Sequence, residues 1–249
     1  MTDLARHIDK WAVTRLHNAM TIIEVDDATI LTDPWFVDSR AFRGVSPIAV
    51  EQLPPLTAII GCHWAKDHWG MEQMAAYPHK GIPVYVGAPS MEAAARTSGF
   101  TNVEVLEWGA RRTITDTVVL HALEEHVGRG GQTNNYGIIG ANARLFFGGE
   151  VLDLDSIRRC GESYGPFDVA VGPVNGVHLL GRQLTATATE MLEAARLLGA
   201  PKLLPVHDEH RAFGPLLRVK SSIRDLDSVA HDDIEIIELD LGQRYEQKS

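Results

Sequence analysis

Two kinds of hydrophobic pattern recur along this chain, and they predict different elements. Short apolar runs bounded by turn residues predict β-strands, whereas longer segments with a helical spacing of apolar residues predict helices. The predicted strands cover residues 21–24, 29–32, 58–60, 84–86, 103–106, 118–123, 136–139, 145–147, 169–171, 203–206 and 234–239. The predicted helices cover residues 71–76, 90–97 with Ser90 as N-cap, and 189–198 closed by Gly199.

The order of these elements predicts an α/β fold. Early strands are joined by short turns such as Asp26-Asp27, whereas later strands alternate with helices. Each half is a run of strands followed by strand–helix units, so we expect a sandwich of two sheets that is covered by helices. Pro54-Pro55 and Gly165-Pro166 are loop breakers inside this pattern. We therefore expect one domain over residues 1–249.

Composition and charge narrow the class of protein. Hydrophobic residues make up 45% of the chain, which is enough to bury a substantial core, and the net charge of −10 argues against a nucleic-acid partner. Two cysteines, Cys62 and Cys160, are too few for a disulfide scaffold. Residues 1–10 lack the pattern of a signal peptide, and no apolar run reaches the roughly 18 residues of a membrane span. We expect a cytoplasmic protein that acts on a small molecule, without a nucleic-acid or membrane partner and with an oligomeric state that the sequence leaves open.

The candidate chemistry is concentrated in the segment Gly61-Cys62-His63-Trp64-Ala65-Lys66-Asp67-His68, which follows a predicted strand. Imidazole and carboxylate groups are the ligands that Zn, Fe and Mn accept. Adjacent side chains diverge in a regular strand or helix, so Asp67 and His68 favour an irregular turn. Three further candidate ligands each follow a predicted strand: His126, Glu150 and His207.

These segments together resemble the metallo-β-lactamase superfamily, and most closely its small metal-dependent hydrolases of the ascorbate-6-phosphate lactonase type. The resemblance begins at Asp33-Pro34, continues through the loop at His63 and the Glu124-Glu125-His126 segment, and includes Gly148-Gly149-Glu150. It ends at Pro205-Val206-His207. The resemblance implies an α/β fold of the four-layer αβ/βα metallo-β-lactamase type. It also implies that the protein is a metal-dependent hydrolase.

The family's metal loop reads His-x-His-x-Asp-His, and this chain departs from it at the second histidine, where it has Ala65. It also has Glu150 where the family has a bridging aspartate. Alanine cannot ligate a metal, so we expect the first metal site to be weakened and one divalent metal to bind per chain, zinc being favoured over Mn or Fe. The resemblance assigns the second site to Asp67, His68, His207 and Glu150, and it leaves His63 and His126 to the first.

In the family, the counterpart of Asp67 both ligates the metal and orients the nucleophile, which makes Asp67 the expected catalytic residue. A metal-bound hydroxide would attack a small ester, lactone or related carbonyl substrate. Two alternatives stay open at the damaged first site. The protein has become a binding protein without turnover, or it works with one metal. Lys66 either replaces the missing charge or faces solvent.

A second enzyme class is suggested by Gly161-Glu162-Ser163-Tyr164-Gly165, which matches the G-x-S-x-G nucleophile elbow of serine hydrolases. That motif requires a strand before the serine and a helix after it. Here the predicted order is the reverse, and Pro166 indicates a turn. We therefore expect the match at Ser163 to be coincidental.

The sequence also suggests possible roles for five further residues, and for three of them it leaves two roles open. Asp33 either accepts a hydrogen bond from a ligand histidine or forms an Asp-Pro turn. His210 is a substitute ligand or, as we expect, a surface residue near the pocket. His178 contacts substrate or has an ordinary role, and Arg129 is a candidate contact for an anionic substrate. Cys62 is expected to be buried and to point away from the metal loop.

Overall fold

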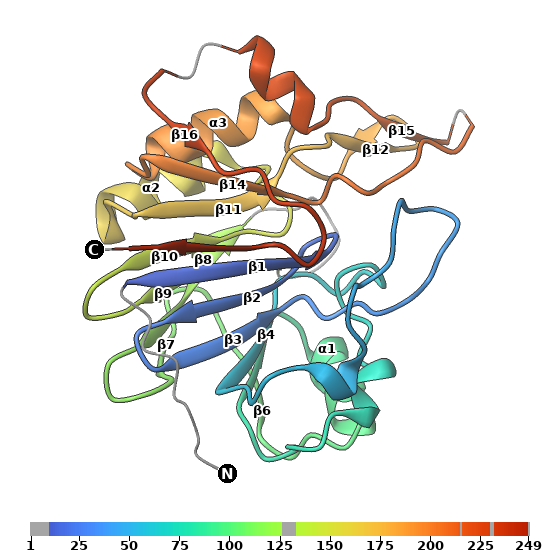
Figure 1. The fold of residues 1–249 in the computed structure, drawn as a ribbon, viewed down its shortest axis with the longest axis vertical. Helices are drawn as coiled ribbons and strands as arrows, with labels where there is room; N and C mark the ends of the chain where they lie inside the picture. The colour runs from blue at the N-terminus through green and yellow to red at the C-terminus, as the bar shows by residue number, and fades with distance from the viewer. Residues whose placement is uncertain (1–9, 126–132, 215, 230–231, 249) are drawn as a thin grey trace.

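Two seven-stranded sheets pack face to face in the computed structural model, which describes residues 10–125, 133–214, 216–229 and 232–248 (Figure 1). Strands at one side of each sheet are antiparallel, and strands at the other side are parallel. The first sheet has the order β17 (Arg244–Gln247), β1 (Trp11–His17), β2 (Met20–Val25), β3 (Ala28–Thr32), β4 (Ala58–Gly61), β5 (Val84–Val86) and β6 (Val103–Val105). The second has the order β16 (Glu235–Ile236), β14 (Lys202–Val206), β11 (Val169–Pro173), β10 (Arg144–Phe147), β9 (Thr133–Ile139), β8 (Val119–Glu125) and β7 (Arg111–Thr113).

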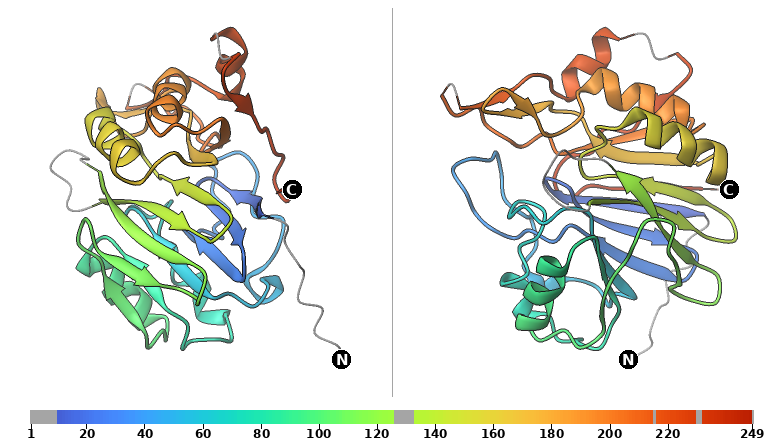
Figure 2. Two further views of the ribbon diagram at one scale, coloured as in Figure 1. Left: turned by 90° about the vertical axis from the view of Figure 1, so that its left-hand side faces the viewer. Right: turned by 180° about the vertical axis from the view of Figure 1, so that it is seen from behind.

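Helices cover the outer faces of both sheets, which gives the predicted four-layer αβ/βα order (Figures 1 and 2). On the first sheet lie α1 (Pro89–Thr97) and the 3-10 turns η1 (Val50–Gln52) and η2 (Gln73–Ala76). On the second sheet lie α2 (Leu154–Tyr164), α3 (Ala188–Leu197) and η3 (Ile223–Ser228). A buried apolar layer lies between the sheets and another lies under each helical layer. Burial of these three layers is the main favourable term in folding.

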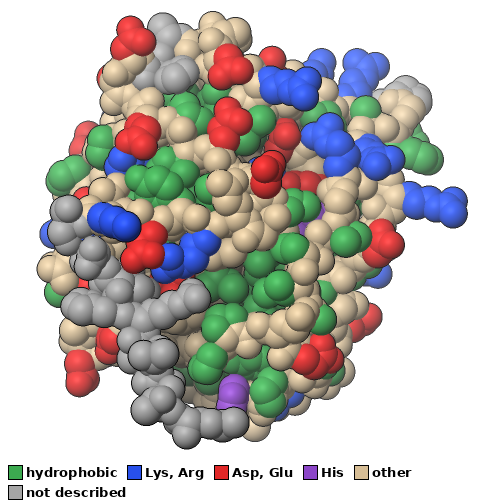
Figure 3. All heavy atoms as spheres, in the orientation of Figure 1, with side chains coloured by type: hydrophobic (Ala, Val, Ile, Leu, Met, Phe, Trp, Pro, Cys, Tyr) green, Lys and Arg blue, Asp and Glu red, His purple; other side chains and the backbone are tan. Residues whose placement is uncertain are grey.

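A third, three-stranded sheet projects from the sandwich and contains β12 (Val177–Leu179), β13 (Arg182–Gln183) and β15 (Leu217–Val219). Lys and Arg side chains gather over this part of the molecule in the space-filling view (Figure 3). Among the described residues, no helix is long and apolar enough to cross a membrane.

Several elements differ from the prediction. Helix α1 begins at Pro89 with Ala88 as N-cap, so Ser90 is not the cap. The helix expected over residues 71–76 is the short 3-10 turn η2, and the last predicted strand shrinks to the two residues of β16. Strand β1 was missed because it lies between two strands and is buried on both faces, so its sequence does not alternate.

The parallel strands place the candidate ligands at one edge of the sandwich. Asp33 follows β3 and the metal loop follows β4, two strands that pair in parallel. Glu150 follows β10, and His207 follows β14. Both strands pair in parallel with β11, which lies between them. Loops beyond the carboxyl ends of parallel strands meet at a common edge, which is where α/β proteins bind ligands.

Candidate metal centre

The loop after β4 forms an irregular turn, as predicted. The backbone N–H groups of His68 and Trp69 both donate to the carbonyl of Ala65, at 2.9 Å each. Asn18 donates its side-chain amide to the Asp67 carbonyl at 3.0 Å, which fixes the turn from the neighbouring hairpin. This geometry brings the side chains of Asp67 and His68 to one side of the loop, whereas Lys66 is exposed. Lys66 therefore faces solvent and does not replace a metal.

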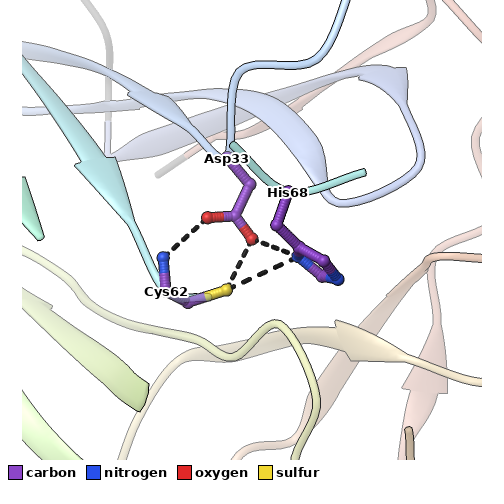
Figure 4. Close-up of side chains that lie close together, drawn as sticks. All are labelled: Asp33, Cys62 and His68. Atoms are coloured by element: carbon purple, nitrogen blue, oxygen red, sulfur yellow. Dashed lines mark hydrogen bonds and ion pairs between the residues drawn. The ribbon is translucent and has the colours of Figure 1, made fainter. Parts of the chain in front are cut away.

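Asp33 orients the ring of His68 (Figure 4). Its fully buried carboxylate lies 2.7 Å from His68 Nδ1 and also accepts the Cys62 backbone N–H at 2.7 Å. An ionised carboxylate only accepts hydrogen bonds, so Nδ1 of His68 carries a proton and Nε2 points away from Asp33. Asp33 thus accepts a hydrogen bond from His68, which is the contact that the first of its two interpretations expected. Its backbone φ of +38° is one of several unusual values at this edge.

Cys62 is buried as expected but points toward the metal loop, which corrects its predicted direction. Its Sγ lies 2.5 Å from Asp33 Oδ2 and 3.7 Å from His68 Nδ1 (Figure 4). Burial and the charge of Asp33 raise the pKa of the Cys62 thiol well above its ordinary value, so the thiol donates to the carboxylate. A Cβ at Gly149 would lie 1.9 Å from this sulfur. Gly149 is therefore needed for close approach.

His207 is positioned from the second sheet. Its Nδ1 lies 3.2 Å from Asn175 Oδ1, and its backbone N–H donates to the Asn18 carbonyl at 3.0 Å. Its φ of +60° is unusual for a residue with a side chain and turns the ring into the site. Asn175, fully buried in the loop after β11, was missed from the sequence. The signal available there was one amide in the otherwise apolar run Pro173-Val174-Asn175-Gly176.

The ligand atoms of three residues converge on one point. Nε2 of His68 lies 3.0 Å from Nε2 of His207, and Oδ2 of Asp67 lies 3.8 Å and 3.7 Å from these two nitrogens. All three residues form a group whose ligand atoms lie within 4.8 Å of one another. Because these three come from both sheets, the fold itself brings them together.

The charges of this group are coupled. Burial by itself lowers the pKa of His68, but the carboxylates of Asp67, Asp33 and Glu150 outweigh it and raise that pKa to about 9. Burial lowers the pKa of His207 to about 3 despite Asp67. Burial would raise the pKa of Asp67, but the neighbouring His68, His207 and His210 hold it well below its ordinary value.

These charges show that the site suits a cation. The imidazolium of His68 donates Nδ1–H to Asp33 and Nε2–H to neutral His207, which in turn donates Nδ1–H to Asn175. The proton between the Nε2 atoms of His68 and His207 lies beside the Asp67 carboxylate. A metal ion bound by the same three groups would lie at about this position. His and Asp are the donors that first-row divalent metals accept, so the residues present fit such a metal.

A second group lies beside the first and contains His63, His68 and Glu150. His63 Nδ1 lies 3.0 Å from Glu150 Oε1. The other oxygen of Glu150, Oε2, is buried and has no hydrogen-bond partner within the described ranges. A buried carboxylate oxygen without a partner is costly, and a cation would satisfy it. His126 and Arg129 lie outside the described residues.

Glu125, at the end of β8, supports the Glu150 loop. It is buried and accepts hydrogen bonds from Asn135 Nδ2 at 2.6 Å and from the backbone N–H groups of Leu152 and Asp153. Burial raises its pKa to about 7 although these hydrogen bonds oppose the shift. Nothing in the local sequence pattern distinguishes Glu125 from the neighbouring Glu124.

His210 is buried at the site, so its predicted surface position is wrong. Its Nε2 lies 3.0 Å from Asp67 Oδ2, and its ring stacks on His207 with centroids 4.8 Å apart. The ring of Phe42 packs on the ring of His210 with centroids 4.2 Å apart. The backbones of these two residues also form an isolated β-bridge. His210 therefore holds the Asp67 carboxylate in place.

Two other candidates lie apart from this centre. Ser163 lies on the last turn of α2, and its side chain is exposed. A nucleophile elbow requires a strand before the serine, whereas the residues before Ser163 are helical. His178 lies on β12, where its Nδ1 is 3.0 Å from the Gly176 carbonyl, and it borders a different pocket.

A pocket of about 700 Å³ adjoins the centre at Asp67 and His210. Its remaining walls come from the chain after β3, from the segment after the metal loop and from α1. This volume is in the usual range for a small-molecule site.

Comparisons with known sequences agree with this geometry. The sequence pattern of the beta-lactamase superfamily domain matches residues 28–207. An uncharacterized protein of Mycobacterium tuberculosis is 22% identical over 215 residues, which are 79% of this chain and 58% of that protein. The chain thus spans little more than half the length of that relative. The N-acyl-phosphatidylethanolamine-hydrolyzing phospholipase D 1 of Caenorhabditis elegans is 21% identical over 266 residues, which cover 94% of this chain and 75% of that protein.

A comparison of folds gives a similar result. The isothiocyanate hydrolase from Delia radicum gut bacteria superposes with a TM-score of 0.76 over 95% of this chain and 99% of that one, at 16% identity. At this identity the match concerns the fold, and it supports the four-layer arrangement.

Proposed function

Because this chain belongs to the beta-lactamase superfamily, we propose that it is a metal-dependent hydrolase and that Asp67, His68 and His207 hold its divalent metal. One observation carries this proposal. The Nε2 atoms of His68 and His207 face each other at 3.0 Å, and the other ring nitrogen of each is engaged by Asp33 or Asn175. Such engagement of the second nitrogen is the usual support of a ligating histidine.

We further propose that one metal binds per chain, zinc being favoured over Mn or Fe. The Asp67 side of the centre offers three donors, one each from Asp67, His68 and His207. The His63 side shares His68 with the Asp67 side and has Ala65 where a further histidine would stand. With His68 assigned to the Asp67 side, His63 and Glu150 remain as the donors of the His63 side among the described residues. Three or four protein donors are the usual number for a zinc ion, and two are too few.

The chemistry follows from these groups. A bound divalent metal lowers the pKa of a coordinated water and polarises a substrate oxygen. Asp67, ionised and held by His210 at 3.0 Å, is placed to accept a hydrogen bond from the attacking water and so to orient it. Glu150, which lies beside His63 and His68, offers its unpartnered Oε2 as a second acceptor. Asp67 is therefore the proposed catalytic residue.

The proposed substrate is a small ester, lactone or related carbonyl compound. The named relatives act on different electrophiles, a phospholipid in one case and an isothiocyanate in the other. Their common feature is attack by water on a polarised centre, so neither substrate transfers to this chain. A pocket of about 700 Å³ beside Asp67 has the size for a small molecule.

The test of this proposal is metal content, measured by elemental mass spectrometry on protein purified without a metal-affinity step. We expect about one equivalent in the wild type, about none in His68→Ala, and no change in the control His79→Ala, an exposed histidine away from the site. Chelation should abolish ester or lactone hydrolysis, and a fluorophosphonate should leave Ser163 unlabelled. If no metal binds after reconstitution with Zn, Mn and Fe, a binding protein without turnover becomes the better interpretation.

Ala65→His tests the one-metal proposal separately. The new imidazole would supply the histidine that the family's loop has at this position, so we expect metal content to rise from about one to about two equivalents. Wild-type protein that already binds two equivalents would contradict the proposal.

A further inference from the structure

The pocket beside Asp67 has mostly apolar walls. It contains about 700 Å³ and is bordered by residues from four parts of the chain, namely residues 35–42, 66–73 and 94–98 and the segment of His210 and Leu217. The apolar residues that border it include Trp35, Val37, Phe42, Trp69, Met71 and Ala94. Several of these are well packed, because Trp35, Phe42 and Trp69 are buried and the tilted rings of Trp35 and Phe42 are in contact, with centroids 4.2 Å apart.

The charged residues of the pocket come from one segment of the chain, with His210 beside it. Lys66, Asp67 and Glu72 all come from the segment that contains the metal loop, and His210 lies beside Asp67. The residues contributed by the chain after β3 and by α1 with its C-cap carry no charge. A molecule that reacts at Asp67 therefore extends from a polar centre over an uncharged surface.

The walls of this pocket determine which chemical groups a substrate can carry next to its reacting centre. An apolar group placed against these walls gains from burial, by a factor of about four in affinity for each fully buried methylene. A charged group there would lose its hydration without an opposite charge to replace it. Large apolar pockets with a few polar groups at one end are typical of sites that orient a substrate by its apolar part.

We propose that this pocket binds an apolar acyl or aryl group attached to the reacting carbonyl, so that the substrate class is esters and lactones of hydrophobic acids. The inference rests on the proposed hydrolase function. In the reaction, water adds to the acyl carbon as the bond from that carbon to the alcohol oxygen breaks, which gives a carboxylic acid and an alcohol. The apolar group stays in the pocket while the carbonyl lies beside Asp67.

The test compares acetyl, butyryl and octanoyl esters of one alcohol on the metal-loaded enzyme. We expect kcat/KM to rise by about 100-fold from the acetyl to the octanoyl ester, which is well below the limit for six fully buried methylenes. Ala94→Phe fills the pocket from α1 and should reduce the ratio of octanoyl to acetyl kcat/KM by at least about tenfold. Val37→Phe, which fills it from the opposite wall, should have the same effect.

Ala93→Phe is the matched control, because Ala93 lies on the same helix but is exposed and does not border the pocket. It should leave the ratio unchanged. Binding of 1-octanol, followed by the fluorescence of Trp35 and Trp69, provides a measurement that needs no turnover. Its Kd should weaken at least about tenfold in Ala94→Phe and stay constant in Ala93→Phe.

The outcomes separate the two proposals. If octanol binds in this way but no ester is cleaved, the pocket proposal stands and the hydrolase proposal fails. If esters are cleaved with equal kcat/KM at every chain length and Ala94→Phe changes neither measurement, the pocket proposal is overturned and the hydrolase proposal stands.

Discussion

His68 shows how single residues determine the properties of the centre. Asp33 fixes which ring nitrogen carries the first proton, and Asp67, Asp33 and Glu150 together raise the pKa to about 9. Near neutral pH the metal-free site therefore holds a proton that a metal must displace. Metal binding and protonation then compete for the same nitrogen.

This competition predicts a pH dependence of metal affinity. Because the folded-state pKa of His68 is raised from 6.5 to about 9, the apparent association constant should rise about tenfold per pH unit up to about pH 9 and then level off. Asp67 adds nothing to the slope near neutral pH because its pKa is held low. Titration calorimetry from pH 6 to 10 in several buffers measures both the affinity and the proton release.

Asp33→Asn is the control for this assignment. The amide removes one of the charges that raise the pKa of His68, so the level part of the profile should begin at lower pH. Affinity at high pH should also fall, by about 10–100-fold, because the ring loses its support. A profile that is flat in the wild type contradicts the competition.

At the scale of elements, the segment after β14 is held by an ion pair that lies outside the centre. Arg15 on β1 contacts Glu209 at 2.5 Å, and its side chain also donates to the Leu239 carbonyl at 2.7 Å. Both charged side chains are largely buried, with 8% and 6% exposure. The pair ties the first sheet to the segment that contains His207 and His210.

Breaking this pair should destabilise the protein strongly. Glu209→Ala leaves a buried guanidinium without its partner, so we expect the free energy of unfolding of the metal-free protein to fall by about 3–5 kcal/mol. Urea denaturation measures it. The matched control is Glu235→Ala, whose pair with Lys202 is much more exposed and should be worth less than about 1 kcal/mol. Equal losses in the two variants would show that the Arg15–Glu209 pair has no special role.

At the scale of the whole molecule, the ligands connect the two sheets. Asp67 and His68 follow β4 of the first sheet, whereas His207 follows β14 of the second. Strand β17, near the end of the chain, pairs with β1 at its start. We therefore propose that residues 1–249 form one domain, with the metal centre joining its halves.

Metal should thus stabilise the whole fold. At a free metal concentration 100 times the Kd, linkage adds about 2.7 kcal/mol to the free energy of unfolding, which for a chain of this size raises the Tm by about 5–10 °C. Scanning calorimetry with and without a chelator tests this. In His68→Ala the chelator should not change the Tm, and a chelator shift of equal size in that variant would place the metal elsewhere.

The sequence by itself determined the order of the layers and the candidate ligands. Strands such as β4 and β14 are buried in the parallel parts of the sheets, so each is a short, continuous apolar run. Such a run can be recognised from the local sequence alone. Polar residues in the loops after such strands lie at the ligand-binding edge, which together with the family resemblance made Asp67, His68, Glu150 and His207 the candidate ligands.

Only the tertiary structure decided how these residues are supported. Asn175 and His210 were missed or misplaced because their roles depend on contacts with His207 and Asp67, which lie far away in the chain or on another sheet. The direction of Cys62 likewise follows from the close approach of Gly149 on the opposite sheet. Such contacts arise when the two sheets pack, and a local pattern of hydrophobic and polar residues does not encode them.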